Sequence, residues 1–230
     1  MNFIKEDETL DLFWLHIKKC GGQSLRKAMF PFYKELDRKN PSSFIQLPKA
    51  YWNDNLNNYR VPLGDYDFKR SLFAKEFLFT SAEWQGMFKF AIVRNPFDRI
   101  ISNWLYLKPI SRKAIPRWLR GKLSLESFCD MLPELWETKY DRHLASHTAP
   151  IWPDVSDQRG ECLLDYIGRL ETIDDSLKEI EKKSGLKFKS ITKNNSNIKR
   201  KRYRNYISRS SRRKIEQLYR QDFEKFDYDF

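Results

Sequence analysis

The stretch LFWLHIKKCGGQSLRKAM, from Leu12 to Met29, decides the fold that we expect for this chain. Its opening residues are mostly apolar and do not alternate with polar ones, which is typical of a strand in a parallel sheet covered on both faces. Gly21 and Gly22 allow a tight turn, and the apolar spacing after them predicts a helix. Exposed N–H groups at such a helix start, beside Lys18 and Lys19, would bind a phosphate or a sulfate.

This loop alone leaves a purely structural turn open, because many strand-to-helix turns carry a glycine pair and a lysine and bind nothing. The Walker pattern does not apply. Lys19 precedes Gly21, and the chain contains no Gly-Lys-Ser or Gly-Lys-Thr sequence. Ser24 is expected to cap the helix or to form a hydrogen bond there.

A second stretch, FKFAIVRNPFDRIISNWLYL from Phe88 to Leu107, repeats the order of a buried strand, a polar junction and a helix. Asn95 is a suitable N-cap, and Pro96 suits the first helical position. Arg94 is placed at the carboxyl end of the strand, where open α/β sheets bind ligands. Ser102 lies off the apolar stripe of the helix and is therefore available to a group outside the core. That stripe consists of Phe97, Ile100, Ile101, Trp104 and Leu105.

These two stretches resemble the two nucleotide-binding motifs of sulfotransferases that use 3′-phosphoadenosine 5′-phosphosulfate (PAPS). HIKKCGGQSL is similar to the 5′-phosphosulfate loop, and VRNPFDRIISNW is similar to the 3′-phosphate motif, in the expected order. The resemblance is closest to carbohydrate O-sulfotransferases of the heparan and chondroitin type, whose loop commonly reads HIPKTGGTS. Lys18, Cys20 and Gln23 depart from that pattern, whereas Lys19 keeps the position of the essential lysine. LLDYIGRLETIDDSL and the ending YRQDFEKFDYDF also resemble family segments, so the similarity covers most of the chain.

The resemblance implies an α/β fold, a single domain over residues 1–230 with a central parallel sheet flanked by helices, similar to P-loop proteins. It implies transfer of a sulfuryl group from PAPS to an acceptor hydroxyl, with adenosine 3′,5′-bisphosphate (PAP) as product and no required metal. Arg94 and Ser102 would then bind the 3′-phosphate. The sulfate end would be bound by Lys19 and the backbone of Gly21, Gly22, Gln23 and Ser24.

Two histidines, His143 and His147, lie in the segment YDRHLASHTAPIW. A histidine is often only a satisfied polar group, so the resemblance decides between them. His147 with Pro150 matches the family arrangement HxxP, in which the histidine is thought to be the base, although Ile151 departs from the usual glutamine. We therefore favour His147 as the general base, with His143 as the alternative.

The chain has a net charge of +12, and its excess of basic residues falls between Lys182 and Ile215, where no acid occurs. Such a run supplies sequence-independent affinity for nucleic acid, so a non-catalytic, nucleic-acid-binding protein on a retained sulfotransferase scaffold is the alternative function. In related sulfotransferases a basic loop here closes over the nucleotide, and for that reason we expect no nucleic-acid partner. Ser196, Lys199 and Arg202 are the residues that this resemblance assigns to the nucleotide.

The acceptor and the compartment are less constrained. We expect a hydroxyl-bearing glycan or glycoconjugate, and a basic stretch between Arg99 and Leu125 is consistent with an anionic one or with a solvated surface loop. No apolar stretch is long enough to cross a bilayer. The protein is expected to be cytoplasmic if microbial, and Golgi-lumenal if it is a part of a longer eukaryotic protein. The three cysteines lack zinc-like spacing, and we expect no disulfide framework.

Overall fold

The computed structural model of the chain describes residues 12–29, 32–36, 42–59, 61–110, 123–137, 142–189 and 207–229. These residues form two compact units. The sheet unit comprises the described residues within Met1–Ile17, Gly21–Val93 and Pro153–Ile191. The helical unit comprises the described residues within Lys18–Cys20, Arg94–Trp152 and Thr192–Phe230. Both candidate motifs therefore contribute residues to each unit, because the chain passes from one unit to the other inside each motif.

The sheet unit is built on a three-stranded parallel sheet in the order β1-β2-β3. The strands are β1 (Leu12–Leu15), β2 (Phe88–Val93) and β3 (Tyr166–Arg169). Leu12 pairs with Phe88 in the first ladder, and Phe90 pairs with Tyr166 in the second. Almost every residue of β1 and β2 is buried, as a parallel sheet covered on both faces requires. The two predicted strands and the α/β class are confirmed.

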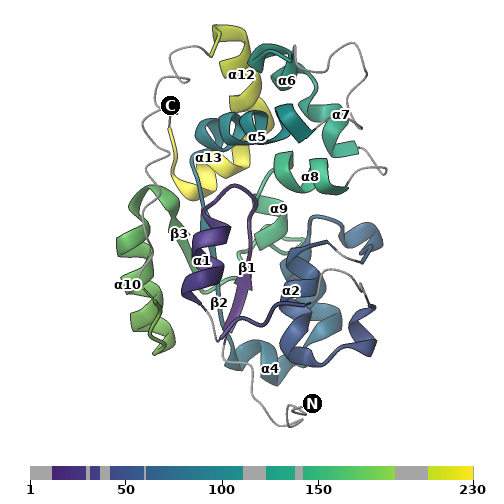
Figure 1. Cartoon of the computed structure of the whole chain (residues 1–230), viewed down its shortest axis with the longest axis vertical. Helices are drawn as coiled ribbons and strands as arrows, with labels where there is room; N and C mark the ends of the chain where they lie inside the picture. Colours follow the sequence, from purple (N-terminus) through teal and green to yellow (C-terminus); the bar gives the residue numbers. More distant parts are fainter. Residues whose placement is uncertain are drawn as a thin grey trace. The chain divides into compact units, whose positions relative to one another are not determined.

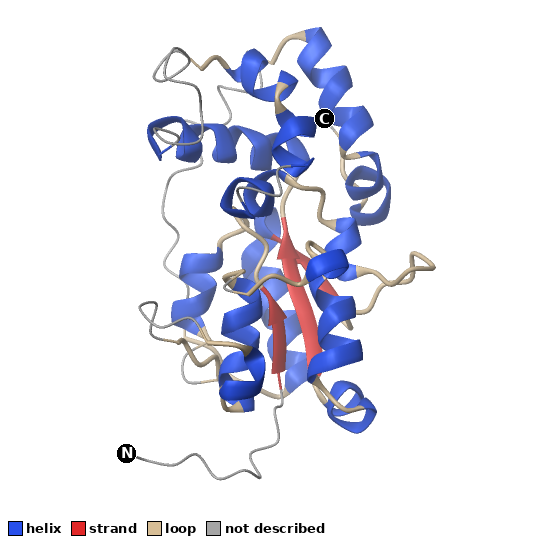
Figure 2. Ribbon diagram, turned by 90° about the vertical axis from the view of Figure 1, so that its right-hand side faces the viewer, coloured by secondary structure: helices blue, strands red, loops and turns tan. Residues whose placement is uncertain are grey.

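Helices cover the sheet on both faces, and Figure 2 shows the strands running between them. On one face, Trp14 and Phe90 pack with residues of α1 (Gly22–Ala28) and α10 (Ile173–Ser184). On the other, Phe13 meets Trp84 of α4 (Ser81–Gly86) edge to face, with ring centroids 5.2 Å apart. The remaining elements of the unit are η1 (Phe44–Gln46), η2 (Lys49–Tyr51), α2 (Trp52–Asn57), η3 (Gly64–Tyr66), α3 (Arg70–Phe73), the π-helical turn η4 (Ala74–Leu78) and η5 (Leu170–Thr172).

A buried ion pair anchors the carboxyl end of β1 within the sheet unit. Arg70 is 1% exposed, and its Nε donates to the Asp154 carboxylate at 2.9 Å and 3.1 Å. Its Nη1 donates to the carbonyl oxygen of His16 at 3.1 Å and to the Asn57 side chain at 3.2 Å. The guanidinium is thus paired and bonded on several sides, which offsets the cost of burying it.

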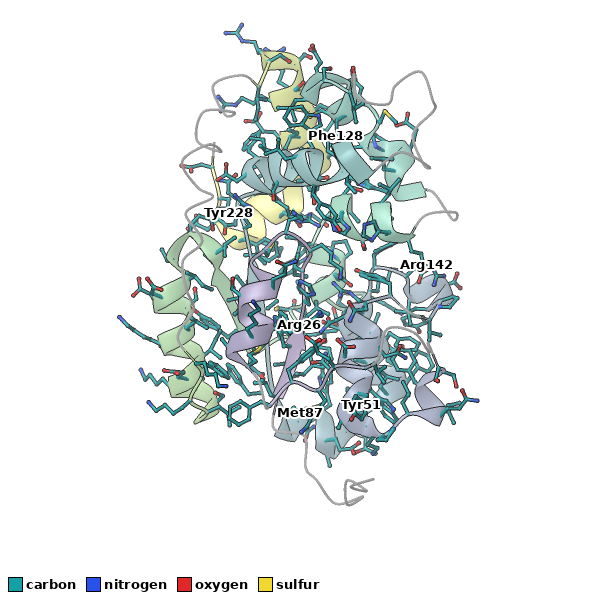
Figure 3. The ribbon with its side chains drawn as sticks, viewed as in Figure 1. Arg26, Tyr51, Met87, Phe128, Arg142 and Tyr228 are labelled. Atoms are coloured by element: carbon teal, nitrogen blue, oxygen red, sulfur yellow. The ribbon has the colours of Figure 1, made fainter. Side chains whose placement is uncertain are left out.

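The helical unit packs its helices around an apolar cluster that includes Phe128, labelled in Figure 3. Figure 1 shows α12 beside α6 and running into α13. The helices are α5 (Pro96–Ile110), α6 (Leu125–Asp130), α7 (Leu132–Glu137), α8 (Arg142–Thr148), α12 (Arg209–Leu218) and α13 (Arg220–Phe226). The short α9 (Trp152–Val155) begins at the last residue of one helical-unit segment and continues into the sheet unit.

Local signals in the sequence are confirmed at some helix ends and not at others. The Asn95 side chain accepts from the N–H of Phe97 at 3.0 Å, so the predicted cap of α5 is present. Gly185 ends α10 with a left-handed main chain. Thr172 precedes α10 but forms no capping box, because its main chain (φ −117°, ψ 46°) does not have the extended form that directs a side chain at the helix start. Thr80 and Glu83 form one instead, at the start of α4.

Cys20, Cys129 and Cys162 are not joined by disulfides in this structure. Among the helices of the described residues, none is both long and apolar enough to cross a membrane.

Candidate active site

The loop after β1 holds two residues in a left-handed main-chain conformation. Lys19 has φ 67° and Gly21 has φ 82°. Glycine adopts this conformation freely, whereas a lysine does so only when the surrounding structure holds it. The N–H group of Ser24 donates to the Gly21 carbonyl oxygen at 3.0 Å, which closes the first turn of α1. The predicted glycine turn is therefore present, but the Ser24 side chain does not cap the helix.

Two arginines, Arg94 just before α5 and Arg99 in its first turn, donate hydrogen bonds to the main chain of this loop inside the helical unit. Arg99 donates from Nε to the Lys18 carbonyl oxygen at 3.3 Å and from Nη1 to that of Ala149 at 2.8 Å. Arg94 donates from Nη1 to the Lys19 carbonyl oxygen at 3.5 Å. These bonds explain how Lys19 is held in its strained conformation. They also connect the lysine loop to the residue that follows α8.

The guanidinium of Arg94 lacks a counter-charge among the described residues. Arg94 is 4% exposed, and in this part of the chain its single hydrogen bond is the long one to Lys19. Arg70, equally buried, has the carboxylate of Asp154. A buried cation without an anion is costly, because burial removes its hydration and nothing replaces the charge. Arg94 is therefore suited to an anionic ligand.

His147 is buried in α8, the helix whose first residue, Arg142, is labelled in Figure 3. Its Nδ1 lies 2.8 Å from the carbonyl oxygen of His143. Because a carbonyl oxygen can only accept, Nδ1 carries the proton, and Nε2 keeps its lone pair. Asn103 of α5 donates to the main-chain carbonyl of His147 and fixes this end of α8. The imidazole is thus held in the tautomer that a general base requires.

Burial lowers the pKa of His147 to about 3, and the charges of His143, Lys18 and Lys19 act in the same direction. The hydrogen bond to the His143 carbonyl opposes this shift, because it stabilises the protonated ring. His147 is therefore neutral across the physiological range. An anion bound beside the two lysines would offset their charge and raise this pKa, which would strengthen the base when substrate is present.

The ring of Tyr106 contacts both Lys19 and His147. The ammonium nitrogen of Lys19 lies 4.2 Å from the ring centroid. The imidazole of His147 stacks on the same ring, with centroids 4.9 Å apart and planes 13° from parallel. His147, the predicted base, and Lys19, at the position of the essential lysine, therefore share one aromatic neighbour.

A family model described as the sulfotransferase family matches residues 2–229. The chain belongs to the sulfotransferase family. No curated protein and no solved structure matches it. The three-stranded parallel sheet flanked by helices is consistent with the sulfotransferase fold. Membership supports an enzyme that transfers sulfate to an acceptor, and the predicted family is confirmed.

The structure places the predicted site residues of this sulfotransferase in three groups. Lys19, Arg94, Ser102 and His147 all belong to the helical unit, and Ser102 is 3% exposed. The turn residues Gly21, Gly22, Gln23 and Ser24 follow Lys19 directly in the chain and belong to the sheet unit, with the Gln23 side chain exposed. Ser196, Lys199 and Arg202 lie outside the described residues.

Three residues of the candidate site were not singled out as site residues from the sequence, namely Arg99, Asn103 and Tyr106. With Ser102 they occupy positions i, i+3, i+4 and i+7 of α5. That spacing makes a polar stripe along one helix face, beside the apolar stripe that was recognised. The signal was present in the sequence, but a stripe of this kind on a helix is usually only a solvated face.

Within the described residues, no group of three or more histidine, cysteine, aspartate or glutamate side chains could hold a metal ion.

Proposed function

We propose that this sulfotransferase moves the sulfuryl group of PAPS to a hydroxyl of a carbohydrate acceptor, a glycan or glycoconjugate. The observation that carries the proposal is the buried Arg94 guanidinium, which has no carboxylate partner among the described residues. Its hydrogen bond is to the carbonyl oxygen of Lys19, and the ammonium group of Lys19 is the second cation. PAPS has separate phosphate and phosphosulfate ends, and Arg94 and Lys19 supply one cation for each.

Each residue has one task in the proposed reaction. Arg94 and Ser102 bind the 3′-phosphate, and the turn from Gly21 to Ser24 binds the phosphosulfate end. Nε2 of His147 takes the proton of the acceptor hydroxyl as the acceptor oxygen bonds to sulfur. Lys19 stabilises the charge that develops on the phosphate oxygen released when its bond to sulfur breaks.

The residues present fit this donor on grounds of charge and conformation. Lys19 keeps a strained main chain that two arginine contacts maintain, and such strain is concentrated at functional sites. A sulfuryl group carries less negative charge than a phosphoryl group, so its transfer, with Lys19 stabilising the released phosphate oxygen, does not demand a metal. Ser196, Lys199 and Arg202, which would contact the nucleotide, remain part of the proposal.

The carbohydrate acceptor rests on the similarity of the loop to HIPKTGGTS and on the chain's net charge of +12. Positive charge attracts an anionic substrate over a range of several ångströms. A screen of sulfated and unsulfated glycans, with small alcohols and tyrosine peptides as comparison acceptors, would identify the class. Preference for a non-carbohydrate acceptor would overturn this part of the proposal and leave the donor site intact.

The deciding experiment is a calorimetric titration with PAP, using ATP and adenosine 5′-monophosphate as comparison nucleotides. We expect PAP-selective binding that weakens by at least about tenfold in Arg94→Ala, since hydrogen bonds to charged groups contribute about 1.5–3 kcal/mol. Arg212→Ala removes an exposed arginine of α12 and should bind PAP normally. Lys19→Ala should lose most turnover. A well-folded wild-type protein without selective PAP binding would refute the donor assignment.

A further inference from the structure

Tyr106 occupies a position that the assigned roles do not explain. It belongs to α5, whereas Lys19 comes from the loop after β1 and His147 from α8. Its half-buried ring meets the Lys19 ammonium at 4.2 Å and the His147 imidazole at 4.9 Å. The exposed His143 ring lies farther off, at 6.0 Å and tilted by 48°. All these contacts lie within the helical unit.

The contacts of the ring are specific in chemistry as well as in position. An aromatic face attracts an ammonium group, and a nearly parallel imidazole stacks on it favourably. Tyr106 also packs against the apolar cluster of the helical unit, so its contacts with Lys19 and His147 come in addition to that packing. The ring of Tyr106 therefore does more than fill space.

The ring also limits the freedom of the two groups on which transfer depends. A lysine side chain is long and has several rotatable bonds, whereas a tyrosine ring has few and is fixed by its helix. His147 is held at Nδ1 by the His143 carbonyl, and the Tyr106 ring covers a face of its imidazole. A group held in place before substrate arrives needs no reorganisation during the reaction.

We propose that Tyr106 is a positioning residue whose ring holds the Lys19 ammonium and the His147 imidazole in one fixed arrangement. This inference rests on the proposed function, which gives those two residues their roles. The ring carries the effect and the hydroxyl does not, because both contacts are made to the ring. Tyr106→Phe should therefore keep Lys19 and His147 in position, whereas Tyr106→Leu should not.

The kinetic test compares Tyr106→Phe with Tyr106→Leu under saturating acceptor. In Tyr106→Leu we expect kcat to fall by at least about tenfold with the KM for PAPS little changed, since small misplacements of reacting groups cost this much or more. Tyr106→Phe should recover most of the lost kcat. The matched control is Tyr66→Leu, which removes an aromatic ring from the sheet unit, where Tyr66 packs edge-on against Phe77. Equal kcat in the phenylalanine, leucine and wild-type proteins would overturn the proposal.

A second measurement needs no turnover. Titration of the histidine ring resonances in the ligand-free protein reports the surroundings of His147, on which Lys18 and Lys19 of the loop and His143 of α8 also act. Tyr106→Leu should raise the His147 midpoint towards the ordinary value of 6.5, because water reaches the uncovered ring and Lys19 moves away. Tyr106→Phe should leave it unchanged.

The two measurements separate the two ideas. A wild-type protein without turnover contradicts the proposed function, and the titration then still decides whether Tyr106 holds His147. An active wild-type protein whose leucine variant keeps both its kcat and its His147 titration contradicts only the role of Tyr106.

Discussion

The Nδ1–H group of His147 donates to the carbonyl oxygen of His143 one helical turn earlier, at 2.8 Å. This bond determines which ring nitrogen can act as a base, and it does so through the main chain of α8. The side chain of His143 is not needed for it. Sequence comparison alone favoured His147 over His143, and this bond gives a physical reason for the same choice.

Replacing His147 with alanine should abolish transfer while PAP binding stays near normal. General bases contribute about 10²–10⁴-fold to rate, so kcat should fall by that order. His143→Ala keeps the carbonyl oxygen that fixes the tautomer, and its kcat should exceed that of His147→Ala by at least about tenfold. Steady-state kinetics and PAP calorimetry on both variants check this. Full transfer in His147→Ala would assign the base to another group.

The buried, neutral His147 should make the protein less stable in mild acid. Burial lowers its pKa to about 3 in the folded state, whereas the unfolded chain has the ordinary value of 6.5. Below pH 6.5 the unfolded state binds a proton that the folded state does not, so the free energy of unfolding falls as pH decreases and levels off near pH 3. The limiting slope is about 1.4 kcal/mol per pH unit.

Urea unfolding at several pH values between 7 and 4 measures this slope. His147→Gln should lose the part of the slope that the imidazole contributes, and His143→Gln, at an exposed position, should keep it. A slope equal to wild type in His147→Gln would show that other groups cause the acid sensitivity.

Removing Arg70 should destabilise the sheet unit strongly. Arg70→Leu leaves the Asp154 carboxylate, 5% exposed, without its counter-charge, and breaking a buried pair in this way costs about 3–5 kcal/mol. The double variant Arg70→Leu/Asp154→Leu should recover much of that loss, because no buried charge remains. Arg212→Ala, which removes an exposed pair with Glu216, should cost less than about 1 kcal/mol. Thermal unfolding of the three variants tests this order, and an equal loss in all three would contradict it.

Adding a side chain at Gly22 should also destabilise the sheet unit. A Cβ atom there would lie 1.7 Å from Nε2 of His16, so the imidazole would have to move. Gly22→Ala should cost about 1–3 kcal/mol, as overpacking of a buried position does. Gly86→Ala is the matched control, since a Cβ atom meets nothing within 4 Å in α4, and it should be neutral or stabilising by about 0.4–1 kcal/mol. A stable Gly22→Ala protein would mean that His16 has another accessible rotamer.

The strands and helix starts that position the site were predictable because their signals are local. The apolar run before Lys18 predicts β1, and the sequence Arg94-Asn95-Pro96 predicts the end of β2 and the cap of α5. Side-chain caps were less predictable. Ser24 does not cap α1 because it lies inside the helix, whose N-cap is Gly21. Thr172 does not cap α10 because its main chain lacks the extended form that capping requires.

The sequence by itself determined the family, the α/β fold and the chemical types available to the site, since these depend on patterns within short segments. Only the tertiary structure decided that the Arg94 guanidinium is buried without a described carboxylate, that Nε2 of His147 is the basic nitrogen, and that Tyr106 touches Lys19 and His147 together. The physical reason is that burial, tautomer and ring contacts depend on residues far apart in the chain. Lys19 and Tyr106 interact at 4.2 Å although a strand and several helices separate them in sequence.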